Sequence, residues 1–388
     1  MRQMRKIKLG VIGVGNMGRA HCKNIKDGNC PEIDLVAIAD CNPARIQAMK
    51  DDGYENVTYF LSAEEMMDSG IIDSVLVAIP HYDHAEYAIM AMNKGLHVMV
   101  EKPAGVYTKQ AREMNEVAAN SNVVFGMMFN QRTNHIYRKA KELVSSGKFG
   151  NIRRVNWMIT NWYRPQFYYD SGDWRATWSG EGGGVLLNQC PHQLDLLQWI
   201  CGMPVSVQAF MKFGQWHDIE VEDDVTVYME FENGATGCFV TSTGDAFGTN
   251  RLEIQMEKGK IVIENDEIKA WEFAMSEPEL SRTTTNPFPK MDKTELEIVT
   301  DGKHEKHYGV MNAFAGAILR GEALVANGEE GINGLMLSNA MHLSAWTESK
   351  VSLPIDEELY YNELMKRVQT SRRKTTTVEV VADTSNTY

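Results

Sequence analysis

The chain has 388 residues, of which 43% are hydrophobic and 23% are charged, and this composition excludes a mostly disordered protein. Acidic residues number 52 and basic residues 39, and the net charge of −13 argues against a nucleic-acid-binding protein. No apolar run approaches the roughly 18–20 residues that a membrane-spanning helix requires, and the length is sufficient for two domains.

The start of the chain is basic, and the stretch that follows, residues 7–15, predicts a β-strand rather than an export signal. Lys8 interrupts this stretch, which ends in glycines instead of a long apolar segment. The six cysteines are scattered and show neither a C-x-x-C pair nor the spacing of metal ligands. We therefore expect reduced, buried thiols, no metal site and a cytoplasmic location.

Residues 1–130 alternate short apolar runs with helical segments, which predicts parallel strands covered by helices on both faces. Asn42 before Pro43 indicates the start of one helix, and Ser62 with Glu65 forms a capping box at the start of another. The predicted strands cover residues 6–13, 34–39, 57–60, 74–79, 97–100 and 123–127. We assign residues 1–130 to a doubly wound α/β domain.

Residues 131–388 show a different pattern, in which strands dominate. Apolar and polar residues alternate over 224–231 and 252–256, which predicts strands with one buried and one solvated face. We expect an α+β domain with a large, mostly antiparallel open sheet, a long loop over 276–293, and a flexible tail or arm over about 371–388. The predicted helices cover about residues 134–146, 186–201, 309–320 and 331–348.

A G-x-G-x-x-G motif, formed by Gly13, Gly15 and Gly18, leaves the first predicted strand and enters a helix. The first glycine permits a tight turn, the second lets the backbone approach a diphosphate, and the third lets the helix pack on the strand. Diphosphate oxygens would then lie on the N–H groups at the positive end of the helix dipole. The motif predicts a dinucleotide site, with Asn16 and Met17 in the same loop.

Asp40 lies at the end of the second predicted strand, 22 residues beyond Gly18. A carboxylate at this position accepts hydrogen bonds from both ribose hydroxyls and repels a 2′-phosphate, which favours NAD over NADP. Arg45 could stack on the adenine or reach a 2′-phosphate, so the preference between the two cofactors stays open. A solvated loop carboxylate is the weaker interpretation of Asp40.

Two further residues are candidates for chemistry. Lys102 follows the fifth predicted strand, at the carboxyl end of the sheet, where it would point towards a nicotinamide. His192 lies four residues after Asn188, and if Asn188 is a helix N-cap, Pro191 falls in the first turn. Taken alone, Lys102 could be a solvated lysine and Asn188 could be only a helix cap. His192 could likewise be a polar residue whose hydrogen bonds are satisfied within the protein.

The stretch before His192 is dense in aromatic and arginine residues. Aromatic faces cover the C–H faces of a sugar ring, and Arg and Asp side chains bind its hydroxyls, so a polyhydroxylated substrate is favoured over simple core packing. The candidate substrate contacts are Tyr163, Arg164, Trp174, Arg175, Asn188 and His192.

Several segments together resemble the Gfo/Idh/MocA family, which includes glucose-fructose oxidoreductase and inositol dehydrogenase. They are residues 13–18, 79–103, 139–155, 188–202 and 328–346, together with Asp40. The resemblance implies a Rossmann domain followed by an open-faced sheet used in substrate binding and in assembly of a homo-oligomer (a dimer, tetramer or hexamer). It also implies that Lys102 and His192 match the family's catalytic lysine and histidine.

The resemblance adds Pro80, His84, Glu101 and Lys102 to the expected cofactor contacts. The family commonly has Asp where this chain has Asn188, and a neutral amide can orient an imidazole but cannot stabilise its charged form. We therefore expect His192 to act as the base and Lys102 to assist, or the reverse.

The expected function is NAD-dependent oxidation of a secondary hydroxyl of a sugar or glycoside. The segment before His192 resembles the branch of the family that acts on glucosides, which favours oxidation at C3. The alternatives are an NAD-dependent glycosidase that oxidises C3 transiently and eliminates the aglycone, an inositol dehydrogenase, and a non-catalytic dinucleotide-sensing or sugar-sensing regulator. Whether NAD stays bound and is recycled, and whether His304 and His307 contact the substrate, are left open.

Overall fold

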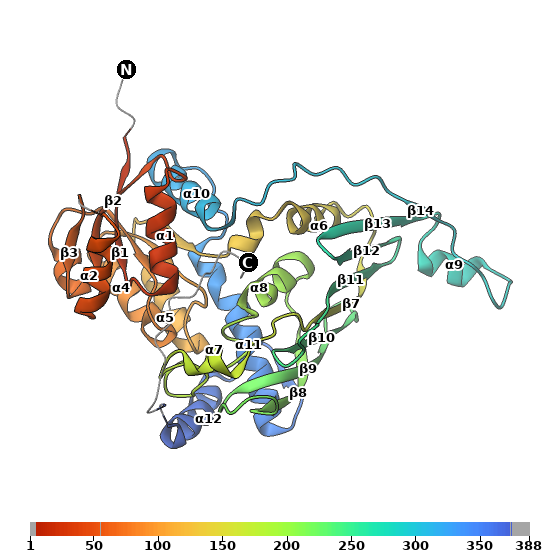
Figure 1. Cartoon of the computed structure of the whole chain (residues 1–388). Coiled ribbons are helices and arrows are strands. Elements are labelled where there is room, and N and C mark those ends of the chain that lie inside the picture. Colours follow the sequence, from red (N-terminus) through yellow and green to blue (C-terminus); the bar gives the residue numbers. More distant parts are fainter. Residues whose placement is uncertain (1–4, 55, 373, 375–388) are drawn as a thin grey trace. The chain divides into compact units, whose positions relative to one another are not determined.

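The computed structural model describes residues 5–54, 56–372 and 374 (Figure 1). Within these residues the chain forms two compact units, one of residues 5–133 and 304–335 and the other of residues 134–303 and 336–374. The stretch 304–335 therefore belongs to the first unit, although the sequence analysis assigned it to the second domain.

The first unit contains a six-stranded parallel sheet with the order β3-β2-β1-β4-β5-β6. This order confirms the doubly wound fold, because the strand order reverses direction between β1 and β4. The strands are β1 Ile7–Ile12, β2 Ile33–Ala39, β3 Thr58–Phe60, β4 Ser74–Val77, β5 His97–Val100 and β6 Phe125–Met127. The helices are α1 Asn16–Lys26, α2 Pro43–Asp51, α3 Ala63–Asp68, η1 His81–Asp83, α4 His84–Asn93, α5 Thr108–Ala119, η2 Asn130–Thr133, α10 Lys306–Arg320 and η3 Gly328–Glu330.

The two helix starts predicted at Asn42 and Ser62 are confirmed. The Asn42 side chain accepts a hydrogen bond from the N–H of Ala44 at 2.9 Å, and Ser62 accepts one from Glu65 at 3.1 Å. Helix α10 packs its buried Met311 and Phe314 into the same apolar cluster as the strands β1 and β2. A segment more than 300 residues from the chain start thus completes the core of the first unit.

The second unit contains a nine-stranded sheet with the order β14-β13-β12-β11-β7-β10-β9-β8-β15. All neighbouring pairs are antiparallel except β7 and β10, which confirms the predicted mostly antiparallel sheet. The strands are β7 Ile152–Ile159, β8 Ser206–Phe213, β9 Glu222–Glu230, β10 Thr236–Ser242, β11 Asn250–Met256, β12 Gly259–Glu264, β13 Glu267–Phe273, β14 Lys293–Glu295 and β15 Val351–Ser352. The helices are α6 His135–Ser145, α7 Gln166–Asp170, α8 Pro191–Cys201, α9 Glu277–Thr283 and α12 Glu357–Thr370, and α11 Gly331–Thr347 contains residues of both units.

One face of this sheet is buried and the other is exposed. On β9, Val225, Val227 and Met229 are buried, whereas Thr226 and Tyr228 on the opposite face are exposed, as the alternation predicts. Helices α6 and α8 lie over the buried face (Figure 1).

Two local predictions are wrong. Helix α8 begins at Pro191 with Cys190 as its N-cap, so Asn188 is not the cap, and residues 186–190 form a turn instead of helix. The Asn188 side chain is instead bound through Nδ2 to Glu181 and through Oδ1 to the Tyr168 hydroxyl, two residues before the N-cap. The stretch 276–293 also contains helix α9, which the Ser276 hydroxyl caps. Of the predicted tail, only residues 371, 372 and 374 lie within the described part of the chain.

Candidate active site

The glycine-rich loop joins β1 to α1. Gly13 has φ +85°, and a Cβ added there would lie 2.5 Å from the Ala78 carbonyl oxygen, while a Cβ on Gly18 would overlap the Gly13 carbonyl oxygen. Gly15 is different, because nothing lies within 4 Å of its added Cβ and its φ is an ordinary −67°. The loop therefore needs Gly13 and Gly18 for its own packing, whereas the space at Gly15 is available to a ligand.

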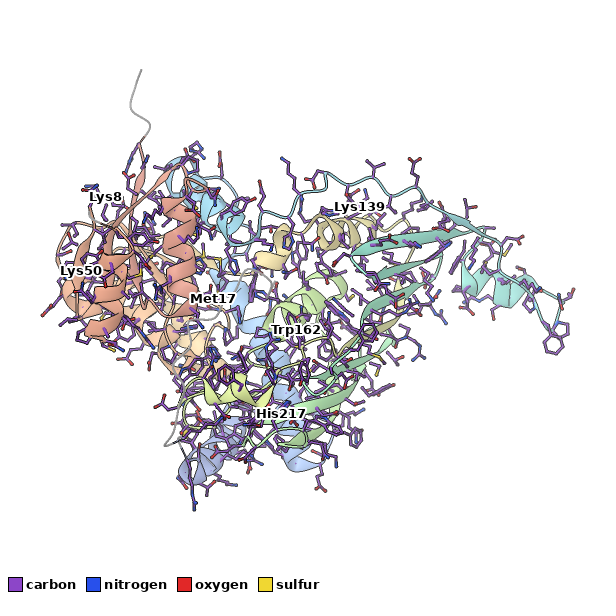
Figure 2. All side chains as sticks on the ribbon, viewed as in Figure 1. Lys8, Met17, Lys50, Lys139, Trp162 and His217 are labelled. Carbon is purple, nitrogen blue, oxygen red and sulfur yellow. The ribbon has the colours of Figure 1, made fainter. Side chains whose placement is uncertain are left out.

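Helix α1 begins directly at this space, with Met17 in its first turn (Figure 2). Its N-cap is Gly15, which has no side chain that could accept hydrogen bonds from the N–H groups of that turn. Open space beside such N–H groups is the arrangement that a phosphate group requires at a helix N-terminus.

Asp40 follows β2 and connects the end of that strand to the glycine loop. Its Oδ2 accepts a hydrogen bond from the N–H of Val14 at 2.9 Å, and its Oδ1 accepts one from Asn42 at 2.9 Å. The Nη1 of Arg45 lies 3.7 Å from Oδ2, on a side chain that is 45% exposed. Each carboxylate oxygen can still accept a second hydrogen bond, as binding of ribose hydroxyls would require.

Glu101 fixes the backbone at Lys102, at the carboxyl end of β5. Its Oε2 accepts a hydrogen bond from the Lys102 N–H at 3.0 Å, and its Oε1 lies 2.6 Å from Nε2 of His21 on α1. Burial by itself would raise the pKa of Glu101, but the hydrogen bond with His21 and the charges of His21, His307 and Lys102 lower it to about 2. Glu101 is thus ionised at neutral pH beside the Lys102 backbone.

His84 connects the ends of β4 and β5. Its Nδ1 lies 2.7 Å from the Pro103 carbonyl oxygen and its Nε2 lies 2.8 Å from the Ile79 carbonyl oxygen. Burial lowers the pKa of this imidazole, against the effect of both carbonyl contacts. Pro80 is the residue between Ile79 and η1. The structure therefore shows His84 holding the turn that contains Lys102, while contacts of Pro80 and His84 with a cofactor stay predictions.

His307 belongs to the same part of the first unit. Its ring centroid lies 5.3 Å from that of His21, and its Nε2 lies 3.0 Å from Nδ2 of Asn130. Burial and the positive charge of His21 lower the pKa of His307 to about 3, although Glu101 opposes the shift. His21 was missed from the sequence, because 80 positions separate it from Glu101 and no local pattern marks the pair.

The second unit contains His192, in the first turn of α8 and buried with 1% of its surface exposed. Glu222, at the start of β9, fixes the turn that leads to it. The Glu222 carboxylate accepts hydrogen bonds from the N–H groups of Gly184, at 2.8 and 2.9 Å, and of Leu186, at 3.0 Å. Nε2 of His342 on α11 lies 2.9 Å from the same carboxylate. The Glu222 carboxylate and the His342 imidazole are both fully buried, and neither residue was predicted from the sequence.

Asn188, in this turn, joins a buried carboxylate to a tyrosine hydroxyl. Its Nδ2 donates to Oε1 of Glu181, whose Oε2 accepts a hydrogen bond from the Ala176 N–H at 2.6 Å. Its Oδ1 lies 3.5 Å from the Tyr168 hydroxyl. Burial raises the pKa of Glu181, and the nearby Arg175 reduces that shift. The amide of Asn188 is thus bound to a buried carboxylate. Its partner, Glu181, stands immediately before three consecutive glycines, and this place in the sequence was the signal that could have identified it.

The predicted substrate residues are brought together around Tyr168. Arg175 donates from Nη1 to the Tyr168 hydroxyl at 3.0 Å, and its Cζ lies 4.5 Å from the Trp174 ring centroid. Arg164 stands over the same tyrosine ring and donates to the carbonyl oxygen of Tyr163, whose own side chain is exposed. The structure therefore groups Arg164, Trp174, Arg175 and Asn188 through one tyrosine.

Distant residues hold this segment in place. Nε2 of His217 lies 2.8 Å from the Arg164 carbonyl oxygen. After α12, the Ser371 hydroxyl donates to Glu220 at 2.6 Å, and Lys374 donates to the Tyr169 carbonyl oxygen at 2.7 Å. The end of the described chain thus stabilises the segment that contains the predicted substrate residues.

Neither a metal-binding cluster nor a membrane-spanning helix occurs among the described residues. They contain no group of three His, Cys, Asp or Glu side chains arranged to hold a metal ion. None of their helices combines the length and the apolar character that crossing a membrane requires.

The doubly wound sheet, the glycine loop and the buried carboxylate after β2 define a dinucleotide-binding protein, and the space at Gly15 fits the diphosphate of that ligand. Residues 7–129 match the model of the oxidoreductase family with an NAD-binding Rossmann fold, and residues 137–262 match the GFO/IDH/MocA C-terminal domain. The chain belongs to the GFO/IDH/MocA family of NAD-dependent oxidoreductases.

Characterised relatives match over most of their length. Myo-inositol 2-dehydrogenase of Thermotoga maritima is 25% identical over 90% of this chain and 99% of its own length. D-glucoside 3-dehydrogenase of Escherichia coli is 26% identical over 89% of this chain and 97% of its own. The crystal structure of the WlbA dehydrogenase from Bordetella pertussis, in complex with NADH and UDP-GlcNAcA, has a TM-score of 0.76 at 26% identity, with 91% of this chain and 100% of that chain covered. The protein is thus an enzyme, and NAD is its cofactor.

Proposed function

We propose that the protein oxidises a secondary hydroxyl of a sugar or glycoside, with C3 as the favoured carbon. The observation that carries this proposal is the group of aromatic, arginine and amide side chains around Tyr168, directly before the turn that leads to His192. Aromatic and hydrogen-bonding groups in this combination suit a ring with many hydroxyls. Two relatives support the same substrate class, since their names are D-glucoside 3-dehydrogenase and levoglucosan dehydrogenase.

Oxidation of an alcohol requires loss of a hydride and of a proton, and bound NAD supplies the hydride acceptor. In our proposal the imidazole of His192 removes the hydroxyl proton. Lys102 donates a hydrogen bond to the same oxygen while negative charge develops on it. Glu101 and His84 are positioning residues in this scheme, because they hold the backbone on both sides of Lys102.

Asn188 has a separate role in the proposal. An amide donates and accepts at once, and its Nδ2 is already bound to Glu181. Its Oδ1, 3.5 Å from the Tyr168 hydroxyl, can accept a second hydrogen bond, which we assign to a substrate hydroxyl. This role differs from that of the family's aspartate, since Asn188 does not add charge beside His192.

The substrate assignment is tested with a panel of neutral glucosides, anionic glycosides and inositols. We expect absorbance of NADH to appear with glycosides and the product to be the 3-keto sugar, identified by mass spectrometry and NMR. Net NADH formation is the deciding observation against the glycosidase alternative, which predicts free sugar and no net reduction of NAD. Turnover of inositols alone would overturn the glycoside assignment in favour of an inositol dehydrogenase, for which the relative from Thermotoga maritima provides the precedent.

We further propose that two copies of the chain associate through the exposed face of the nine-stranded sheet. Phe210, Thr226, Val240 and Met158 form one row across β8, β9, β10 and β7 on this face. Phe210 is 66% exposed and Met158 47%, so this row presents large apolar side chains to solvent on one face, as an association surface would.

Charge introduced into this row is expected to separate the copies. Phe210→Glu should shift the mass measured by light scattering from an oligomer towards 43.8 kDa, because burying a carboxylate between two sheets is unfavourable. Leu61→Glu, at an exposed apolar residue of the first unit, is the control and should leave the mass unchanged. A wild-type protein that is monomeric at micromolar concentration would refute this assembly.

The cellular location is also part of the proposal. All six cysteines are free thiols, and free thiols in this number are typical of proteins in a reducing compartment. We therefore propose a cytoplasmic enzyme.

A further inference from the structure

Two arginines flank one tyrosine ring in the second unit. The Cζ of Arg164 lies 5.2 Å from the ring centroid of Tyr168, and the Cζ of Arg175 lies 4.7 Å from it. The two guanidinium groups are therefore within about 10 Å of each other. Each also stands over a tryptophan, Arg164 over Trp162 at 5.6 Å and Arg175 over Trp174 at 4.5 Å.

Among the described residues, neither guanidinium makes a hydrogen bond or an ion pair to an acidic side chain. Within the described residues, Arg164 donates only to the Tyr163 carbonyl oxygen, at 2.9 Å, and Arg175 only to the Tyr168 hydroxyl, at 3.0 Å. A guanidinium has five N–H donors, so most of the donors on both arginines are available to a ligand.

Other arginines of this acidic chain do have carboxylate partners. Arg138 pairs with Asp301 at 2.9 Å and Arg320 with Glu32 at 2.6 Å, although both arginines are at the surface. Within the described part of a chain that carries a net charge of −13, Arg164 and Arg175 are two neighbouring arginines that lack such an ion pair and are both in contact with aromatic rings.

The nearest buried acid, Glu181, does not replace such a partner. Its Oε2 accepts a hydrogen bond from the Ala176 N–H and its Oε1 one from the Asn188 amide, and the residue is only 2% exposed. Burial raises the pKa of Glu181 and the charge of Arg175 opposes that shift, so this one acid compensates at most one of the two guanidinium charges. The cluster therefore keeps a positive potential.

The two arginines belong to the same hydrogen-bonded group as the turn before His192. The Tyr168 hydroxyl, which Arg175 contacts, lies 3.5 Å from Asn188 Oδ1 and 3.4 Å from Gln189 Nε2. Contacts of both guanidinium groups with aromatic rings restrict them before any ligand arrives, which reduces the entropy lost on binding.

We propose that Arg164 and Arg175 form a subsite for an oxyanion, so that the natural substrate of the reaction proposed above is a sugar derivative bearing a carboxylate or a phosphate. The inference rests on the proposed function, which concerns the oxidised hydroxyl. It adds a second recognised feature of the substrate, an anionic group that the two arginines bind. Carboxylate and phosphate are the groups that arginine binds most strongly, through pairs of parallel N–H···O hydrogen bonds.

The test compares kcat/KM for four glycosides that share one oxidisable ring. They are methyl glucoside, which is neutral, methyl glucuronide, methyl glucoside 6-phosphate and UDP-glucose. We expect the carboxylate or the phosphate compounds to exceed the neutral one by about 10- to 100-fold, the effect of one or two charge-assisted hydrogen bonds. The member of the series that reacts fastest distinguishes a carboxylate, a phosphate monoester and a diphosphate.

The variants Arg164→Gln and Arg175→Gln should lose that preference. We expect each variant to lower kcat/KM for the favoured anion at least about 10-fold more than it lowers kcat/KM for methyl glucoside. Arg175→Lys should recover part of the loss, because it keeps the charge without the planar fork. Arg154→Gln, at an exposed arginine on β7, is the matched control and should change neither value. Arg164→Gln is tested independently, so misfolding of one variant, detected by its melting temperature, leaves the other informative.

The outcomes separate this inference from the proposed function. Oxidation of methyl glucoside as efficient as that of every anionic compound, in the wild type and in both variants, would overturn the oxyanion subsite and leave the proposed oxidation intact. Failure of all glycosides to reduce NAD would overturn the proposed function itself.

Discussion

Alanine in place of His192 is expected to lower kcat by about 100- to 10,000-fold, because removal of a general base forces the hydroxyl proton to leave without a positioned acceptor. Lys102→Ala is expected to lower kcat by about 100- to 1,000-fold, since the developing oxyanion loses its charged donor. Both values are measured as initial rates of NADH formation at saturating glycoside, and NAD affinity is measured separately by fluorescence titration.

The double variant tests whether the two residues act on the same step. If both act on one hydroxyl, His192→Ala with Lys102→Ala should be only slightly slower than the slower single variant, because groups that act as a unit are not additive. Lys269→Ala, at an exposed lysine on β13, is the control and should stay within about 2-fold of the wild type. A loss of only a few-fold in both single variants would exclude these residues as the acid–base pair.

A side chain at Gly15 is expected to prevent cofactor binding without unfolding the protein. The space around its added Cβ is open and its φ is ordinary, so Gly15→Val should melt near the wild-type temperature in the absence of NAD. The valine would occupy the volume assigned to the diphosphate, and we expect NAD affinity to fall by about 100-fold or more. Gly15→Ala should give a smaller loss in the same direction.

Gly18→Val is the contrasting variant. Its side chain would overlap the Gly13 carbonyl oxygen, so we expect a lower melting temperature together with lost NAD binding. Isothermal titration calorimetry measures the affinity, and differential scanning calorimetry measures the melting temperature. Wild-type NAD affinity in Gly15→Val would show that the diphosphate does not lie at this loop.

The parts of the fold that were predicted correctly depend on short-range patterns. The alternation at 224–231 arises from the period of a strand, and the Asn42 cap arises from a contact with a residue two positions away. Asn188 shows the limit of this reasoning, because a cap is a good local interpretation of an asparagine before Pro191. In the folded chain the Asn188 oxygen faces the Tyr168 hydroxyl and its nitrogen binds the Glu181 carboxylate, and the pattern that predicts a cap at Asn188 marks neither partner.

The residues of the candidate site also divide into those that a short-range pattern marks and those that only the folded chain brings together. Lys102 could be proposed because it follows a strand, and Gly15 because it belongs to a spaced motif. Glu222, which fixes the turn before His192, lies 38 positions from Gly184 and has no motif of its own. Glu222 is an acidic residue at a buried position of the otherwise amphipathic strand β9. This is the single sign near Glu222 that the residue has a special role.

The order of segments along the chain has a consequence for biosynthesis. The first unit requires α10 for its apolar core, and the second unit requires Ser371 and Lys374 to hold the segment around Tyr169. Neither unit can therefore reach its final structure on the ribosome until almost all of the polypeptide has emerged. A ribosome-bound fragment ending near residue 300 should expose apolar surface from β1 and β2 and bind chaperones until translation ends.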